Sequence, residues 1–150
     1  MRLNHFYRVA ADRIFKYDGT LDKMAGDSVM AFFGEPFHDH DHAERAVQCG
    51  LDILAAVKEI TEPESLPVGA GIATGEAFIG NVGHEDAADF TVLGDTVNIA
   101  ARLQGEAAPG ELLISEPTYQ AVRASFPDAP SRQLDLKGKT DLVPARVLSV

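Results

Sequence analysis

The sequence is short of several features that mark particular classes of protein. It has one cysteine, Cys49, so it forms no internal disulfide, which fits a reducing compartment such as the cytoplasm. No apolar run is long enough to cross a membrane and no signal peptide is visible, so the expected location is cytoplasmic. Basic residues are few as well: 13 Lys and Arg stand against 23 Asp and Glu, giving a net charge of -10. Nucleic acid is therefore a poor candidate partner.

The length of 150 residues and the hydrophobic content of 45% suit one domain with its own core. Apolar periodicity and turn residues predict helices over 2–17, 42–60, 96–107 and 116–125. Strands are predicted over 20–33 as a pair, and over 68–74, 77–82, 89–93, 111–114, 132–136 and 143–149. Asp95 and Ser115 are predicted N-caps. This irregular alternation favours one α+β domain, a mostly antiparallel sheet with helices packed on it.

Residues 90–102 are the most informative segment, with the sequence FTVLGDTVNIAAR. A β-like run meets a Gly-Asp turn, and the helix that follows carries Asn98 and Arg102 four residues apart. That spacing puts both side chains on one helix face, one turn apart. An amide donor beside a guanidinium suits a phosphate that gains charge as it reacts.

A second segment, LDKMAGDSVMAFFG over 21–34, reads as two short strands joined at a Gly-Asp turn. Together the two segments resemble the catalytic domain of class III nucleotide cyclases, and their order and spacing match from about residue 1 to residue 150. The resemblance implies a ferredoxin-like sandwich over 1–150 and an enzyme that turns ATP or GTP into the 3′,5′-cyclic monophosphate and pyrophosphate.

Lys23 and Thr91 occupy the positions that read the purine base in the family. A lysine supplies only donors, which suits N1 of adenine, and a threonine hydroxyl can accept from N6. Guanylyl cyclases typically place Glu and Cys there. The sequence thus resembles an ATP-selective adenylate cyclase of the bacterial subgroup with Thr at the second position.

The resemblance also assigns residues to the ribose and the phosphates of the nucleotide. Asn98 corresponds to the residue that orients the ribose, Arg102 to the one that stabilises charge on the α-phosphate, and Lys137 to the lysine that meets the triphosphate tail. Asp27 corresponds to the second of two aspartates that hold two Mg²⁺ or Mn²⁺ ions. In the family the aspartates come from one subunit and the other groups from its partner, so a head-to-tail homodimer with shared sites is implied.

The family's first metal-binding aspartate lies in a strand of the form Phe-x-Asp-hydrophobic-x-Gly-Phe before the first helix, and this sequence has none. One of the two Asp ligands is therefore absent and the domain is N-terminally truncated relative to the family. The neighbouring strands are expected to have unpaired edges. A strand swapped from a partner chain, a fragment of a longer protein and a misassigned start codon all remain open.

The missing aspartate leaves a second reading of the function. The chain is either an adenylate cyclase in cyclic-nucleotide signalling, with a fused or separate sensor domain, or a catalytically inactive homologue. Such a homologue would act as a nucleotide-binding, dimerisation or regulatory module. The Gly-Gly-(Asp/Glu)-Glu-Phe signature of diguanylate cyclases is absent.

Three other features receive plainer interpretations. The run His-Asp-His-Asp-His at 38–42 can bind Zn²⁺ or Ni²⁺, but its place before a helix favours a solvated loop. Cys49 is interpreted as a small core residue. The glycines at 69, 71, 75, 80 and 83 match no phosphate loop and predict tight strand packing instead.

Overall fold

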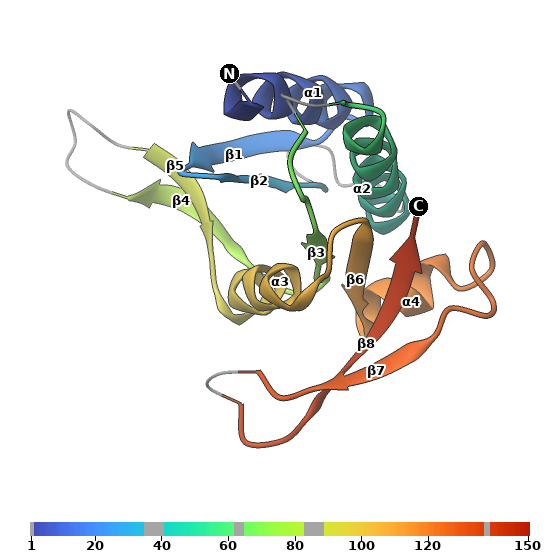
Figure 1. The fold of residues 1–150 in the computed structure, drawn as a ribbon. Helices are drawn as coiled ribbons and strands as arrows, with labels where there is room; N and C mark the ends of the chain where they lie inside the picture. The colour runs from blue at the N-terminus through green and yellow to red at the C-terminus, as the bar shows by residue number, and fades with distance from the viewer. Residues whose placement is uncertain (1, 35–40, 62–64, 83–88, 137–138) are drawn as a thin grey trace.

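The computed structural model describes residues 2–34, 41–61, 65–82, 89–136 and 139–150 (Figure 1). Its elements in chain order are α1 (Arg2–Lys16), β1 (Thr20–Ala25), β2 (Ser28–Phe32), α2 (His42–Lys58), β3 (Ala70–Ile72), β4 (Phe78–Val82), β5 (Asp89–Leu93), α3 (Asp95–Glu106), β6 (Glu111–Ser115), α4 (Glu116–Val122), β7 (Ser131–Leu134) and β8 (Val143–Ser149). The predicted elements are all present, although β3 and α4 are shorter than predicted. Within these residues no helix has both the length and the apolar character to span a membrane.

The strands form a central four-stranded sheet and two hairpins. The central sheet has the order β3-β6-β8-β7; β8 runs antiparallel to both of its neighbours, and β3 runs parallel to β6. The hairpins are β1–β2 and β4–β5, both antiparallel. The prediction of an α+β fold with a mostly antiparallel sheet is therefore confirmed, with β3–β6 as the parallel exception.

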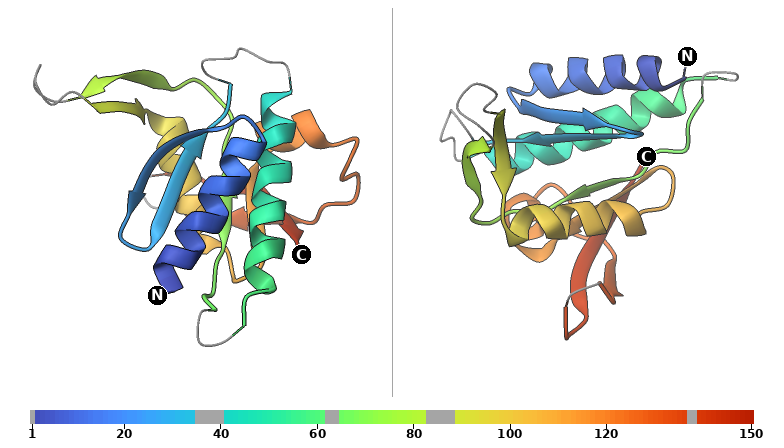
Figure 2. Two further views of the ribbon diagram at one scale, coloured as in Figure 1. Left: turned by 90° about the horizontal axis from the view of Figure 1, so that it is seen from above. Right: turned by 90° about the vertical axis from the view of Figure 1, so that its left-hand side faces the viewer.

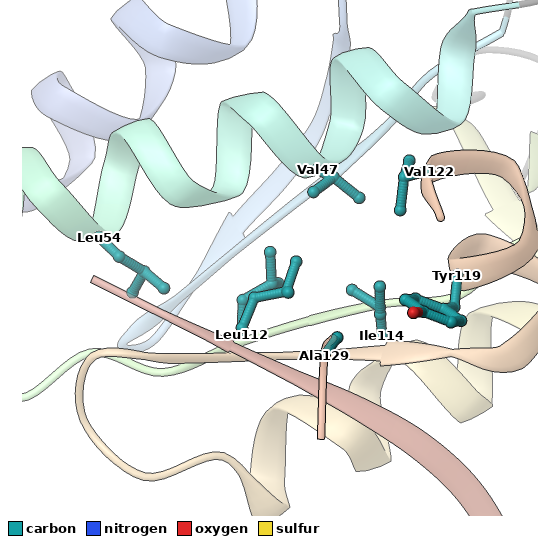
Figure 3. Close-up of a cluster of buried hydrophobic side chains, with 8 residues drawn as sticks. Val47, Leu54, Leu112, Ile114, Tyr119, Val122 and Ala129 are labelled. Atoms are coloured by element: carbon teal, nitrogen blue, oxygen red, sulfur yellow. The ribbon is translucent and has the colours of Figure 1, made fainter. Parts of the chain in front are cut away.

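Strand β6 is the centre of the core because its side chains are buried on both faces. Leu112 and Ile114 point to the face covered by α2 and α4, where they pack in a cluster with Val47 and Tyr119 (Figure 3). Leu113 points to the opposite face, in a second cluster that holds Leu103 of α3, Leu134, Leu136 and Ala145. The alternation along one strand thus fixes helices on both sides of the sheet.

Helix α1 packs on α2 rather than on the central sheet. Its residues Phe6 and Ala10 are buried with Val57 of α2. Near the C-terminal end of α1, three side chains donate hydrogen bonds to the carboxylate of Asp52 in α2: Arg13, Lys16 and Tyr17. Burial alone would raise the pKa of Asp52, but these hydrogen bonds together hold it below its ordinary value.

Several of the described strands lie at the edge of a sheet. Among the described strands, β2 pairs only with β1, and β3 only with β6. The residues of β3 are half-buried, whereas four of the five residues of β6 are buried. The central sheet therefore ends at β3 on one side and at β7 on the other.

The two predicted helix caps are only partly correct. The N-cap of α3 is Gly94, and Asp95 lies in the first turn instead, where its carboxylate pairs with Lys139. Gly94 has φ 134°, a backbone conformation that side-chain-bearing residues rarely adopt. Ser115 does occupy the N-cap of α4, but its hydroxyl lies 3.0 Å from Thr118 Oγ1 and makes no cap hydrogen bond to the backbone. The strand-to-helix turn before α3 is therefore set by Gly94 and not by an aspartate cap.

The contact between α3 and β3 is unusually close because glycine lines it. A Cβ placed on Gly71 would lie 2.6 Å from the carbonyl oxygen of Ala100 and 2.9 Å from Leu103 Cβ, both on α3. A Cβ on Gly69 would lie 2.8 Å from the carbonyl oxygen of Ala107. The prediction of tight packing is confirmed for Gly69 and Gly71, and the absence of their side chains is what lets α3 lie against the strand.

Replacing Gly71 by alanine is expected to lower the free energy of unfolding by about 2–3 kcal/mol, because one added methyl group forces α3 away from β3. Urea denaturation followed by circular dichroism measures the change. Gly105→Ala is the matched control: Gly105 is on the same helix, and nothing lies within 4 Å of a Cβ there. It is expected to stabilise the protein by about 0.5–1 kcal/mol. Equal stability of the two variants would contradict the close-packing account.

Candidate functional site

Helix α3 carries a row of polar side chains on one face. Asp95, Asn98 and Arg102 follow one another at spacings of three and four residues, so they lie above one another along the helix. Asn98 is exposed and Arg102 half-buried. Leu103, fully buried, faces the sheet on another side of α3. The helix therefore presents an amide and a guanidinium together, as the spacing predicted.

Contacts at the N-terminus of α3 fix the direction of this row. Thr96 Oγ1 donates a hydrogen bond of 2.8 Å to the carbonyl oxygen of Glu76. Gly75 leaves room for this hydroxyl, since a Cβ there would lie 2.6 Å from Thr96 Oγ1. Lys139 Nζ bonds Asp95 from the connection between β7 and β8. The first turn of α3 is thus tied to segments before β4 and after β7.

Lys23 and Asp27 both belong to the β1–β2 hairpin. Lys23 pairs with Met30, and the register shifts between Leu21 and Lys23, which makes a bulge next to Lys23. A bulge of this kind redirects the side chain that follows it. Asp27 is an exposed residue of the hairpin turn, and the preceding carbonyl, of Gly26, accepts a hydrogen bond from the Tyr7 hydroxyl of α1.

Of two other predicted residues, the structure describes Thr91 in part and Lys137 not at all. Thr91 lies in β5 opposite Gly80 of β4, and its side chain is outside the described part of the structure. Strand β5 contacts β1, so the strands of Thr91 and Lys23 do meet. Lys137 lies outside the described residues. The described residues on either side of it are near α3: Leu136 packs in the cluster of Leu103, and Lys139 binds Asp95.

The hairpin with Asp27 and the helix with Asn98 and Arg102 are not brought together. Figures 1 and 2 show the β1–β2 hairpin beside α1 and α2 on one side of the molecule and α3 on the other, with the β4–β5 hairpin at one end of both. One chain therefore presents its turn carboxylate and the polar row of α3 at separate places.

The described residues do not by themselves make a metal centre. None of their His, Cys, Asp and Glu side chains form a group of three or more that could hold a metal ion. Asp27 offers one exposed carboxylate. The predicted loop at 38–42 falls largely on residues outside the description, although its last members are visible: Asp41 accepts a hydrogen bond from Arg45, and His42 begins α2.

Cys49 is where the sequence placed it, in the interior. It is 2% exposed, and burial, the largest cause, raises the pKa of its thiol to about 12. A thiol with that pKa is not a nucleophile near neutral pH.

Sequence reasoning missed two contacts of the site. The Tyr7–Gly26 hydrogen bond joins residues 19 positions apart and the Lys139–Asp95 ion pair joins residues 44 positions apart. No short sequence motif predicts either contact. The one available signal was position: Asp95 precedes Asn98 by three residues and so had to share its helix face.

Residues 3–145 match the family model described as "Adenylate and Guanylate cyclase catalytic domain". Among curated proteins, the chain is 36% identical to Adenylate cyclase 1 of Rhizobium meliloti over 109 residues, which is 69% of this chain and 16% of that protein. It spans about a quarter or less of the length of the curated relatives it matches.

Solved structures agree with this match. The crystal structure of the guanylyl cyclase Cya2 superposes with a TM-score of 0.84 at 30% identity, covering 97% of this chain and 77% of that one. The crystal structure of the adenylyl cyclase CyaB from P. aeruginosa superposes with a TM-score of 0.82 at 31% identity, covering 99% and 81%. The two differ in the nucleotide that their descriptions name, so overall similarity leaves the base open.

Proposed function

Because this chain belongs to the adenylate and guanylate cyclase catalytic domain family, we propose that it converts ATP into 3′,5′-cyclic AMP and pyrophosphate in cyclic-nucleotide signalling. The observation that carries the proposal is the row on α3, where Asn98 and Arg102 share one face of a helix that is anchored at its first turn. Donors held in place before the reaction are the main contribution of a protein to phosphoryl chemistry.

The proposed reaction makes one bond and breaks one. The ribose 3′-oxygen attacks the α-phosphorus and loses its proton to solvent water, while the bond from that phosphorus to the bridging oxygen breaks and pyrophosphate leaves. Negative charge builds up on the α-phosphate oxygens during this exchange. Arg102 donates to those oxygens, and Asn98 holds the ribose so that its 3′-oxygen lies in line with the leaving group.

The preference for adenine is proposed from two side chains. The ammonium of Lys23 donates to N1 of the base, and the hydroxyl of Thr91 accepts from N6. The contact between strands β1 and β5 supports this pairing. Guanine presents the opposite pattern at these two positions, with a donor at N1, and would leave the lysine facing a donor.

A divalent ion, Mg²⁺ or Mn²⁺, would supply charge neutralisation at the triphosphate, with Asp27 as one ligand. The described residues of one chain do not complete such a site. We therefore infer that its remaining ligands come from elsewhere: from the substrate phosphates, from other parts of the protein or from a second copy.

A second copy of the chain also accounts for the separation of the functional groups. The β1–β2 hairpin, which carries Asp27, and α3 lie apart within one chain (Figure 2). In a head-to-tail pair, the hairpin turn of each chain would face the α3 row of the other, and two equivalent sites would result.

The observation that favours the alternative, a nucleotide-binding module without turnover, is that the β1–β2 hairpin turn offers a single exposed carboxylate, Asp27, to a metal ion. Such a module would bind ATP through Lys23 and the α3 row and release it unchanged. Measurement of binding and product in the same preparation separates the two functions.

The purified protein is expected to form cyclic AMP and pyrophosphate from ATP in the presence of Mn²⁺, as measured by chromatography. Arg102→Ala is expected to lower kcat about a hundredfold, corresponding to about 3 kcal/mol of transition-state stabilisation. Gln104→Ala, an exposed position on another face of the same helix, is the control and should leave kcat unchanged. ATP binding without any cyclic product would favour the inactive module, and absence of ATP binding would contradict both.

The double variant Lys23→Glu with Thr91→Cys is expected to reverse the base preference, since a glutamate accepts from N1 of guanine and a thiol can donate to O6. The ratio of kcat/KM for ATP to that for GTP should fall at least about tenfold. Lys58→Glu makes the same charge change at an exposed position of α2 and should leave this ratio unchanged. A preference for GTP in the unmodified protein would refute the adenine assignment.

Mixing two inactive variants tests the shared site. Asp27→Asn removes the turn carboxylate and Arg102→Ala the guanidinium, so each homodimer has two defective sites. Random exchange of subunits makes half of the dimers mixed, with one intact site in each, and about a quarter of the original activity should return. Activity that stays at the level of the separate variants would exclude sites shared in this way.

A further inference from the structure

The ion pair between Asp95 and Lys139 is left unused by the reaction proposed above. Lys139 Nζ lies 2.9 Å from Asp95 Oδ1 and 2.8 Å from Oδ2, so one ammonium contacts both oxygens of the carboxylate. Asp95 stands in the first turn of α3, and Lys139 in the connection between β7 and β8. The pair thus joins two elements that are distant in the sequence.

The pair lies in line with the donors on α3. Asp95 precedes Asn98 by three residues and Arg102 by seven, and residues at these spacings occupy one helix face. The ammonium of Lys139 is therefore held at the N-terminal end of the row that carries the amide and the guanidinium. If the α-phosphate of a triphosphate lies beside Arg102, its outer phosphates can extend along the row toward the ammonium of Lys139.

The carboxylate of Asp95 occupies a place that favours an anion. The N-terminus of a helix attracts negative charge, and here the ammonium of Lys139 adds to that attraction. The pair is partly exposed, with the side chains of Lys139 and Asp95 28% and 68% accessible to solvent, and ion pairs of this kind are weak. An incoming triphosphate carries several negative charges and offers stronger acceptors than one carboxylate.

We propose that Lys139 is a further nucleotide-binding residue, which Asp95 holds while the site is empty and releases to the outer phosphates when a nucleoside triphosphate binds. The proposal rests on the proposed function, since it assumes a triphosphate beside α3. Asp95 is then a competing anion built into the site. It lowers the affinity for the triphosphate and keeps Lys139 in place for the next substrate.

The test is equilibrium binding of 3′-deoxy-ATP, which lacks the attacking hydroxyl, by titration calorimetry. Asp95→Asn keeps the shape of the side chain and removes its charge, and is expected to tighten binding about twofold to fivefold because Lys139 is released. Lys139→Gln is expected to weaken binding by a similar factor. The variant with both changes should bind like Lys139→Gln alone, since Asp95 acts only through Lys139.

Two controls separate this competition from a general effect of charge. Glu106→Gln makes the same charge change at the exposed C-terminal end of α3 and should leave binding unchanged. Adenosine, which has no phosphate, should bind all variants equally. Asp95→Ser takes the place of Asp95→Asn if that variant melts at a lower temperature than the unmodified protein.

Each result decides between named outcomes. Asp95→Asn can also be compared in two backgrounds, the unmodified protein and Lys139→Gln. If it tightens 3′-deoxy-ATP binding equally in both, the effect is general electrostatics and the proposal is overturned. Unchanged or weaker binding by Asp95→Asn, with normal binding by the unmodified protein, overturns the proposal and leaves the cyclase function standing. No binding of 3′-deoxy-ATP by the unmodified protein overturns the function and the proposal together.

Discussion

The arrangement of the site depends on the backbone contact between α3 and β3. Gly71 of β3 lies against the carbonyl oxygen of Ala100 in α3, and Gly69, just before β3, lies against that of Ala107, just after α3. Neither glycine position has room for a side chain. A helix held this closely cannot rotate or slide without a clash. Its buried side is filled by Leu103, and its outward side is therefore fixed as well. The direction of Asn98 and Arg102 follows from a set of glycines in a different element.

The electrostatics of the protein depend on local arrangement more than on its overall charge. A chain with a net charge of -10 repels polyphosphate on average, yet the row on α3 carries a guanidinium and has an anchored ammonium at its N-terminal end. One acidic residue of this row is engaged, since Asp95 neutralises Lys139, and farther away Glu111 and Glu116 pair with Arg132 and Arg146. Acidic groups bound in this way leave the site less negative than the composition suggests.

Local patterns predicted the elements well because each is set by a few neighbouring residues. The four-residue spacing of Asn98 and Arg102 placed them on one helix face, and the Gly-Asp pair at 26–27 placed the hairpin turn. The cap of α3 was wrong, because the identity of a capping residue depends on which residue takes the first non-helical conformation, and Gly94 did so ahead of Asp95. The parallel pairing of β3 with β6 was missed, since parallel partners are joined by no local turn. The same holds for contacts such as Lys139–Asp95, which only the finished fold creates.

The bare edges of β2 and β3 have a consequence for the behaviour of the chain in solution. In the described part of the chain each presents a row of backbone donors and acceptors to whatever extended polypeptide approaches. An edge without a partner strand can act as a template for strand addition between molecules. The excess of acidic side chains works against this, because like-charged molecules repel one another before their edges meet. Solubility should therefore decline with added salt, which screens that repulsion, and as the pH falls toward the isoelectric point near 4.8.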